Sequence, residues 1–230
     1  GKNLSTEKKA RMAGLPANLM NRVVFVPHYL AHAHAAFAMS GFENSTILVI
    51  DGLGESLSAL TSDFPNELTP ARHAAFPRPS SARTAADDIG EIVGIYRAEG
   101  TTVTLLEKHI GGWLFGDGPL QTFGSFGAMF SSVAKLAFGD DQEAGKVMGL
   151  APYGQPEYGP TDFLEVGQDG QITFFDGICD RFRDCREGWP ANRVAFENLA
   201  FGVQSALDVG LSRLVERCQS LGRTNDLCYT

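Results

Sequence analysis

The sequence predicts an α/β fold, and three observations support this prediction. Strand-like segments alternate along the chain with segments of helical period, hairpin-like pairs precede helices, and a glycine-rich turn follows a buried strand over residues 46–50. In folds of this class, ligands bind beyond the carboxyl ends of the strands. We therefore expect Asp51, the residue directly after that strand, to lie at a ligand site.

The first half of the chain contains the less regular elements. Pro27 suits the first position of a helix because it lacks an N–H group, and Gly41 is a typical residue after a helix end. Residues 63–100 are rich in proline, alanine, arginine and aspartate, which indicates a loop-rich insertion. The expected elements are a helix over 5–20, a strand over 23–26, a helix from Pro27 to about Ser40, a strand over 46–50 with a hairpin partner over 56–62, a helix near 89–96, a strand over 101–107 and a loop over 109–124.

The second half is more regular, and its clearest element is a long amphipathic helix. The apolar face of that helix is formed by Leu199, Val203, Leu207, Leu214, Cys218 and Leu221. The expected elements are helices over 126–138 and 140–150, a turn over 151–154, a hairpin over 163–175 around Gln168, Asp169 and Gly170, a helix over 192–221 that stops at Gly222, and the first half of a buried strand over 225–230. A half strand without a neighbour predicts that the chain is incomplete.

The composition argues against several classes of protein. With 230 residues, of which 43% are hydrophobic and 20% charged, the chain has the size and balance of a globular domain. A net charge of −8 argues against nucleic acid as the main partner. The sequence contains no apolar run that could cross a membrane and no signal-peptide pattern. Four cysteines without a Cys-x-x-Cys pair predict reduced thiols in a cytoplasmic protein.

A pair of histidines provides the first candidate site. His28 and His32 are four residues apart and therefore share one face of the predicted helix. Two histidines that only bond to backbone are the alternative, but the nearby Asp51 favours a site for a divalent metal. His34 points to another face, so we do not expect it to be a ligand. Tyr29 follows the first histidine, so the glutamate of the metalloprotease motif His-Glu-x-x-His is absent.

The turn after the strand provides a second part of the same site. Asp51 is expected either to join the histidines as a ligand or to hold a metal-bound water, although capping the turn at Gly52 is a simpler role. Gly52 and Gly54 would let backbone N–H groups approach phosphate oxygens, and Glu55 would lie near them. A metal beside a phosphate-binding turn suggests chemistry on a nucleotide.

Residues 143–154 form the other group of interest. Glu143 could accept hydrogen bonds from ribose hydroxyls, Gly145 could allow a close approach, and Lys146 could offset phosphate charge. A solvent-facing ion pair at helical spacing is the simpler interpretation, and composition alone favours it.

Taken together, these motifs resemble the O-carbamoyltransferase family of antibiotic biosynthesis and nodulation factors. The resemblance joins His-x-x-x-His and Asp-Gly-x-Gly-Glu with the pattern Lys-x-Met-Gly-Leu-Ala-x-Tyr-Gly of residues 146–154. Phe126, Gly127 and Phe130 are similar to a helix start in that family. The resemblance spans nearly the whole chain and is least specific over residues 63–124.

The resemblance implies an actin-like ATPase (ASKHA) fold, also found in the tRNA threonylcarbamoyl-transfer proteins. Residues 1–230 would be part of one such domain with two lobes, incomplete at both ends. His28, His32 and Asp51 would bind a divalent metal, most often iron, with zinc or manganese as alternatives, and a further aspartate would lie beyond Thr230. The nucleotide would lie near Gly52, Gly54, Glu55, Glu143, Gly145 and Lys146.

The implied reaction has two parts. Carbamoyl phosphate and ATP give carbamoyl-adenylate on a YrdC-like domain of the same full-length protein, which this chain lacks. The carbamoyl group then passes to a hydroxyl of a small-molecule natural product, with the metal as Lewis acid. The residues indicate no general base. Two alternatives stay open: tRNA threonylcarbamoyl transfer, and a catalytically silent ATP-binding scaffold.

Overall fold

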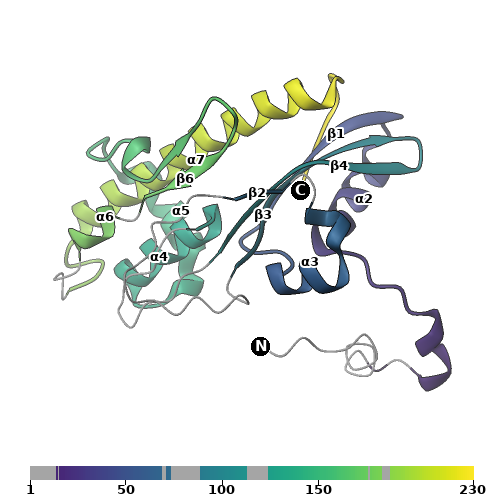
Figure 1. Cartoon of the computed structure of the whole chain (residues 1–230). Helices are drawn as coiled ribbons and strands as arrows, with labels where there is room; N and C mark the ends of the chain where they lie inside the picture. The colour runs from purple at the N-terminus through teal and green to yellow at the C-terminus, as the bar shows by residue number, and fades with distance from the viewer. Residues whose placement is uncertain are drawn as a thin grey trace.

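A central mixed β-sheet with helices on both faces organises the protein (Figure 1). The computed structural model describes residues 14, 16–68, 71–73, 89–112, 124–175, 177–182 and 187–230. Among the described residues, the sheet has five strands in the order β2-β4-β3-β1-β7. The predicted α/β fold class is therefore confirmed. Within these same ranges, no helix is both long and apolar enough to span a bilayer.

Three long strands in antiparallel register form the middle of the sheet. They are β1 (Asn44–Ile50), β3 (Ile89–Glu99) and β4 (Thr102–Gly112). Leu48 of β1 lies opposite Ile95 of β3, which in turn pairs with β4. Two short strands, β7 (Leu227–Tyr229) and β2 (Ala71–His73), pair in parallel with β1 and β4. Because β7 is parallel to β1, both strands end at the same edge of the sheet.

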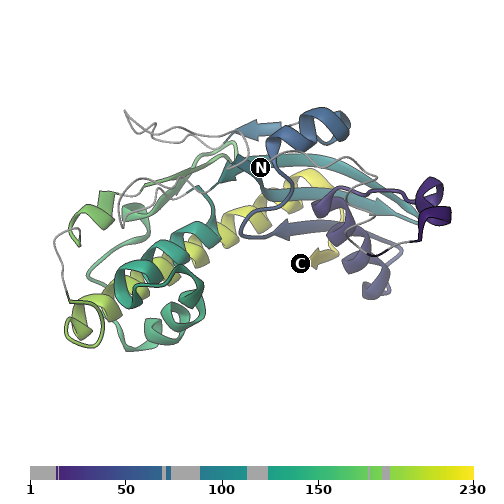
Figure 2. The same ribbon diagram turned by 90° about the horizontal axis from the view of Figure 1, so that it is seen from below.

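Side chains of β1 alternate between two separate parts of the core. Helix α2 (His28–Ser40) covers one face, and helix α7 (Arg193–Gly222) runs along the other (Figure 2). Ile47 and Val49 belong to the cluster on the α2 side, together with Tyr29, Ala33 and Phe37. Leu48 points the other way, into the large cluster that contains residues of α7 such as Leu199 and Val203.

The shorter helices and a hairpin pack along α7 (Figure 2). They comprise α4 (Phe126–Phe138), the 3₁₀ turns η4 (Asp141–Glu143) and η5 (Ala151–Tyr153), α5 (Ala144–Leu150), η6 (Pro160–Asp162), the strands β5 (Leu164–Val166) and β6 (Ile172–Phe174), and α6 (Gly177–Asp180). The hairpin closes where Gly167 N donates to Gln171 O, at 2.8 Å. The helices, hairpin and strand predicted in the second half are thus confirmed, apart from a 3₁₀ first turn at residues 141–143.

Most of the longer helices begin or end at residues that are typical of helix caps. Gly41 and Gly139 end α2 and α4 in the left-handed region, with φ of 75° and 77°. Ser125 begins α4, because its hydroxyl accepts a hydrogen bond from Ala128 N at 3.0 Å. Helix α7 ends at Gly222, although the left-handed residue is Arg223, with φ of 56°.

Several predictions for the first half were wrong. Residues 57–63 form helix α3 (Leu57–Asp63) instead of a strand, because the Ser56 hydroxyl caps it by accepting from Ala59 N. Residues 89–96 belong to strand β3 instead of a helix, and residues 109–112 to strand β4 instead of a loop. Residues 23–26 form no strand in the described structure.

Other first-half predictions fall partly or wholly outside the described residues. Most of the helix expected over residues 5–20 lies outside the described residues. Its last residues belong to the 3₁₀ helix η1 (Ala17–Arg22). The structure also does not describe residues 113–123 of the loop expected over 109–124. The same holds for residues 69–70 and 74–88 of the expected insertion. The 3₁₀ helix η2 (Pro65–Leu68) is described.

The cysteines that can be described are buried thiols. Cys218 of α7 and Cys228 of β7 are free and lie in the interior. Burial, with a smaller effect of Glu107, raises the pKa of the Cys218 thiol to about 12. The Cys218 thiol is therefore protonated near neutral pH. The side chains of Cys179 and Cys185 lie outside the described residues.

A buried carboxylate links the sheet to α7 and predicts a dependence of stability on pH. Burial disfavours ionisation of Glu107, but hydrogen bonds from His109 (2.8 Å) and Arg217 (2.7 Å) outweigh it, so its pKa is lowered. A lowered folded-state pKa contributes stability above the ordinary glutamate value of about 4.3, and this is lost as the pH falls through the folded-state value. We expect Glu107→Gln to reduce the acid-induced fall in unfolding free energy, measured by urea titrations between neutral and acidic pH. An identical fall in both proteins would contradict this assignment.

Candidate metal centre

His28, His32 and Asp51 converge at one edge of the sheet. The two histidines lie on successive turns of α2, with ring centroids 4.7 Å apart. Asp51 directly follows β1, and its Oδ2 lies 3.0 Å from His28 Nε2. Each of the three offers one ligand atom, and these atoms lie within 4.8 Å of one another. One cation could therefore contact all three side chains, whereas His34 is exposed on another part of the helix.

Tyr29 connects the histidine helix to the backbone of Asp51. Its ring is fully buried against the sheet, and its hydroxyl accepts a hydrogen bond from Asp51 N at 3.1 Å. Burial, and to a smaller extent the charge of Glu91, raises the pKa of Tyr29 and outweighs the lowering effect of the hydrogen bond from Asp51 N, so the phenol keeps its proton. The same residue thus anchors α2 in the core and fixes the start of the turn that follows β1.

A threonine that the sequence did not indicate also reaches the site. Thr230, just after β7, places its Oγ1 3.3 Å from His32 Nδ1. Its backbone is held in the sheet, because Thr230 N donates to Leu48 O at 3.1 Å and Thr230 O accepts from Ile50 N at 2.9 Å. The two side chains are 198 residues apart in the sequence, so no local pattern could have predicted the contact.

The turn over residues 51–55 is held by protein acceptors. Gly52 N donates to Asp51 Oδ1 at 2.6 Å, Gly54 N to Glu91 O at 2.8 Å, and Glu55 N to Glu91 Oε2 at 2.9 Å. The N–H groups expected to approach phosphate are engaged within the chain in this arrangement. The role of Gly52, Gly54 and Glu55 at a phosphate stays a prediction.

Behind this turn lies a buried charged network that no sequence pattern indicated. Lys108 is fully buried, and its ammonium group donates to Glu91 and, at 2.6 Å, to Glu67 Oε2. The hydroxyl of Tyr96 also donates to Glu67 Oε2, at 3.2 Å. Burial, followed by the charges of Glu67 and Glu91, raises the pKa of Tyr96. Lys108 thereby supports Glu91, the residue that holds Gly54 and Glu55.

A cavity of about 470 Å³ opens beside Asp51 and Gly52. Its walls are mainly apolar and come from the end of β1, from the helices α4, α5 and α7, and from the 3₁₀ turn η4. Phe126, Phe130 and Met148 form part of the lining, with Gln142 among the polar groups. An organic group bound here would lie next to Asp51 in a largely apolar setting.

The second predicted group lies close to this cavity but points elsewhere. Lys146 Nζ lies 2.7 Å from Glu143 Oε1, and the lysine side chain is 58% exposed. The Lys146 ammonium group also lies 5.6 Å from the centroid of the Phe138 ring. The described cavity lining includes Ala144 and Met148 of this region rather than Glu143, Gly145 or Lys146. The solvent-facing ion pair is therefore present, and the nucleoside role of these three residues stays a prediction.

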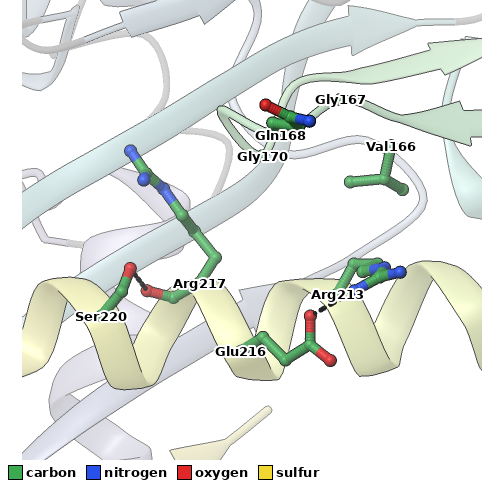
Figure 3. A pocket seen from close by; sticks show the side chains of 8 residues that line it. All are labelled: Val166, Gly167, Gln168, Gly170, Arg213, Glu216, Arg217 and Ser220. Atoms are coloured by element: carbon green, nitrogen blue, oxygen red, sulfur yellow. Dashed lines mark hydrogen bonds and ion pairs between the residues drawn. The ribbon is translucent and has the colours of Figure 1, made fainter.

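Another cavity, of about 340 Å³, lies between α7 and the turn of the β5–β6 hairpin (Figure 3). Arg213 and Arg217 line it from one side and Gln168 from the other (Figure 3). Both guanidinium groups already have carboxylate partners: Arg213 Nη1 donates to Glu216 at 2.7 Å, and Arg217 donates to Glu107. This pairing offsets their positive charge.

Comparison with known proteins places these features in a family. Residues 5–175 match the family model described as the carbamoyltransferase N-terminus, and this match includes both histidines and Asp51. The chain is also 34% identical over 140 residues to nodulation protein NolNO of Sinorhizobium fredii (strain NBRC 101917 / NGR234). That alignment covers 59% of this chain but 13% of NolNO, so the chain spans a small part of that relative's length. Because the family model matches most of the sequence, the chain belongs to the carbamoyltransferase family.

Proposed function

We propose that this chain is part of an ATP-dependent O-carbamoyltransferase. The carbamoyl group would come from carbamoyl phosphate, pass through carbamoyl-adenylate, and reach a hydroxyl of a small-molecule natural product, as in antibiotic biosynthesis. The convergence of His28, His32 and Asp51 is the observation on which this proposal depends most. Membership of the carbamoyltransferase family supports the type of group that is transferred.

The donor set fits a divalent metal. Two imidazoles and a carboxylate suit iron, zinc and manganese, and we propose iron as the metal of this site. When bound, the metal would supply Lewis-acid polarisation and a template for phosphate or carbamoyl oxygens. Asp51 and the histidines would hold it, while Tyr29 keeps the backbone of Asp51 in place. The largely apolar cavity beside Asp51 would bind the organic part of a substrate.

The remaining parts of the proposal follow from the family resemblance. We propose an actin-like ATPase domain, supported by three antiparallel strands that continue into a parallel strand after the long helix α7. The nucleotide would lie near Gly52, Gly54, Glu55, Glu143, Gly145 and Lys146. A YrdC-like domain of the same full-length protein would form the adenylate, and the reaction would take place in the cytoplasm.

The test compares two histidines of the same helix in the full-length protein. We expect His32→Ala to weaken metal binding at least tenfold and to lower the turnover of carbamoyl phosphate and ATP, because one of three ligands is lost. His34→Ala is the matched control, since His34 is exposed and lies outside the cluster. Metal content by elemental analysis and product formation by mass spectrometry are the measurements.

Each outcome distinguishes between candidate functions. Unchanged metal content and turnover in His32→Ala would refute the site. Nucleotide binding without metal or turnover in the wild-type protein would favour a silent ATP-binding scaffold. Specific binding of tRNA would favour threonylcarbamoyl transfer instead.

A further inference from the structure

We propose that Thr230 is a positioning residue that orients His32 toward a bound cation. Its hydroxyl oxygen lies 3.3 Å from His32 Nδ1. This inference rests on the proposed metal-binding role of His28, His32 and Asp51. It adds a residue from a third element, because α2 supplies the histidines, the end of β1 supplies Asp51, and the end of β7 supplies Thr230.

The position of the Thr230 hydroxyl is set by the sheet. Both backbone polar groups of Thr230 bond to β1, to Leu48 O and Ile50 N. Ile50 directly precedes Asp51, so the threonine and the carboxylate are carried by adjacent backbone at one edge of the sheet. The distance between the hydroxyl and the metal ligands therefore depends on sheet pairing rather than on a free loop.

The chemistry of imidazole assigns the direction of the hydrogen bond. A neutral ring has one N–H donor and one nitrogen with a free lone pair, and a metal needs the lone pair. If Nε2 of His32 binds a cation, the ring hydrogen is on Nδ1, and the Thr230 oxygen must accept it. His28 presents the corresponding nitrogen, because its Nε2 lies 3.0 Å from Asp51 Oδ2. The two Nε2 atoms would then converge with the carboxylate on one ion.

A partner of this kind contributes by reducing the cost of ordering the ligand. Hydrogen bonds to the second nitrogen of a ligating histidine fix the tautomer and the ring orientation, and their loss typically weakens metal binding about 10–100-fold. Without the hydroxyl, the His32 ring can adopt the other tautomer or rotate. The free protein would then populate the binding-competent arrangement less often.

The experiment uses full-length protein and Zn²⁺ as a redox-inert probe. We expect Thr230→Val, which keeps the branched shape, to weaken Zn²⁺ binding about 10–100-fold in chelator competition. Thr230→Ser keeps the hydroxyl and should remain within about threefold of the wild-type affinity, because its oxygen can accept the same bond. Thr173→Val is the matched control, since Thr173 lies in β6, outside the candidate metal site.

A second measurement separates positioning from folding. Nitrogen NMR shifts of the His32 ring in the metal-free protein should show Nδ1–H as the main tautomer, and Thr230→Val should reduce its population. Urea unfolding of Thr230→Val should match that of the control variant.

The possible failures can be told apart. If His32→Ala abolishes Zn²⁺ binding while Thr230→Val binds as tightly as wild type, the role of Thr230 is refuted and the metal site stands. If His32→Ala also binds Zn²⁺ normally, the proposed site itself fails. Equal losses in Thr230→Ser and Thr230→Val would show that the hydroxyl is not the group that matters, and would overturn the inference.

Discussion

Replacing Lys108 by methionine is expected to lower the free energy of unfolding by about 3–5 kcal/mol. Lys108 is fully buried, and its ammonium group donates hydrogen bonds to Glu67 and Glu91. The side chain of Glu91 is also fully buried, so removal of the lysine leaves a carboxylate without its charge partner in the interior. Urea denaturation monitored by circular dichroism would measure the loss.

Two further variants show whether charge pairing is the cause. Lys146→Met removes a lysine that also lies 2.7 Å from a glutamate but is 58% exposed, so we expect a loss below about 1 kcal/mol. Adding Glu91→Gln to Lys108→Met removes the unpaired charge and should recover part of the stability, as a double-mutant cycle would show. Equal losses in Lys108→Met and Lys146→Met would contradict a special role for the buried network.

The buried network matters for the site because Glu91 holds the turn after β1. Its carbonyl and carboxylate oxygens accept hydrogen bonds from Gly54 N and Glu55 N. Its own N–H donates to Glu55 O at 3.1 Å. A charge imbalance at Lys108 would therefore disturb the turn that contains Asp51, although Lys108 itself touches none of the proposed ligands.

The histidine–aspartate cluster could be predicted from sequence because each part follows a local rule. Helical spacing places His28 and His32 on one face, and the rule for strand ends places Asp51 at the carboxyl edge of the sheet. The structure brings the three together as expected. The helix Phe126–Phe138 can also be predicted from local sequence, because Ser125 and Gly139 are typical residues for the start and the end of a helix.

Strand β3 shows where local rules fail. Its apolar residues at positions 89, 92, 93 and 96 match the spacing of a helix, so a helix was predicted. The strand lies inside the sheet and is buried on both faces, which removes the alternation typical of a half-buried strand. A register shift between Glu91 and Val93 disrupts the remaining period. Pairing with β1 and β4 therefore makes this segment a strand, although the spacing of its apolar residues is that of a helix.

The polar contacts around the site could not be predicted from the sequence for a related reason. Lys108 and Glu91 lie on neighbouring strands, one of which was not recognised. Thr230 and His32 meet only because β7 pairs with β1. Such contacts depend on the order and register of the strands, which a single sequence without recognised strands does not define.

Gly54→Ala is expected to destabilise the protein by about 2–3 kcal/mol, because the side chains packed against Gly54 leave no space for a methyl group. A Cβ atom at this position would lie 2.4 Å from Tyr29 Cε1 and 2.8 Å from Glu91 Oε2. Both side chains are fully buried and hold the backbone of the turn. Displacement of Tyr29 would also remove the acceptor of the Asp51 N–H group, so we expect weaker Zn²⁺ binding as well.

Gly52→Ala is the matched control and separates packing from ligand binding. A Cβ atom on Gly52 would meet no atom within 4 Å. The free energy of unfolding of Gly52→Ala should therefore stay within about 1 kcal/mol of the wild-type value. If Gly52 serves the close approach of a phosphate, this variant should nevertheless bind ATP more weakly in calorimetric titrations of the full-length protein. Normal ATP affinity in Gly52→Ala would argue against a phosphate at Gly52. Equal stability of Gly54→Ala and wild type would contradict the packing role of Gly54, because two buried side chains cannot yield without cost.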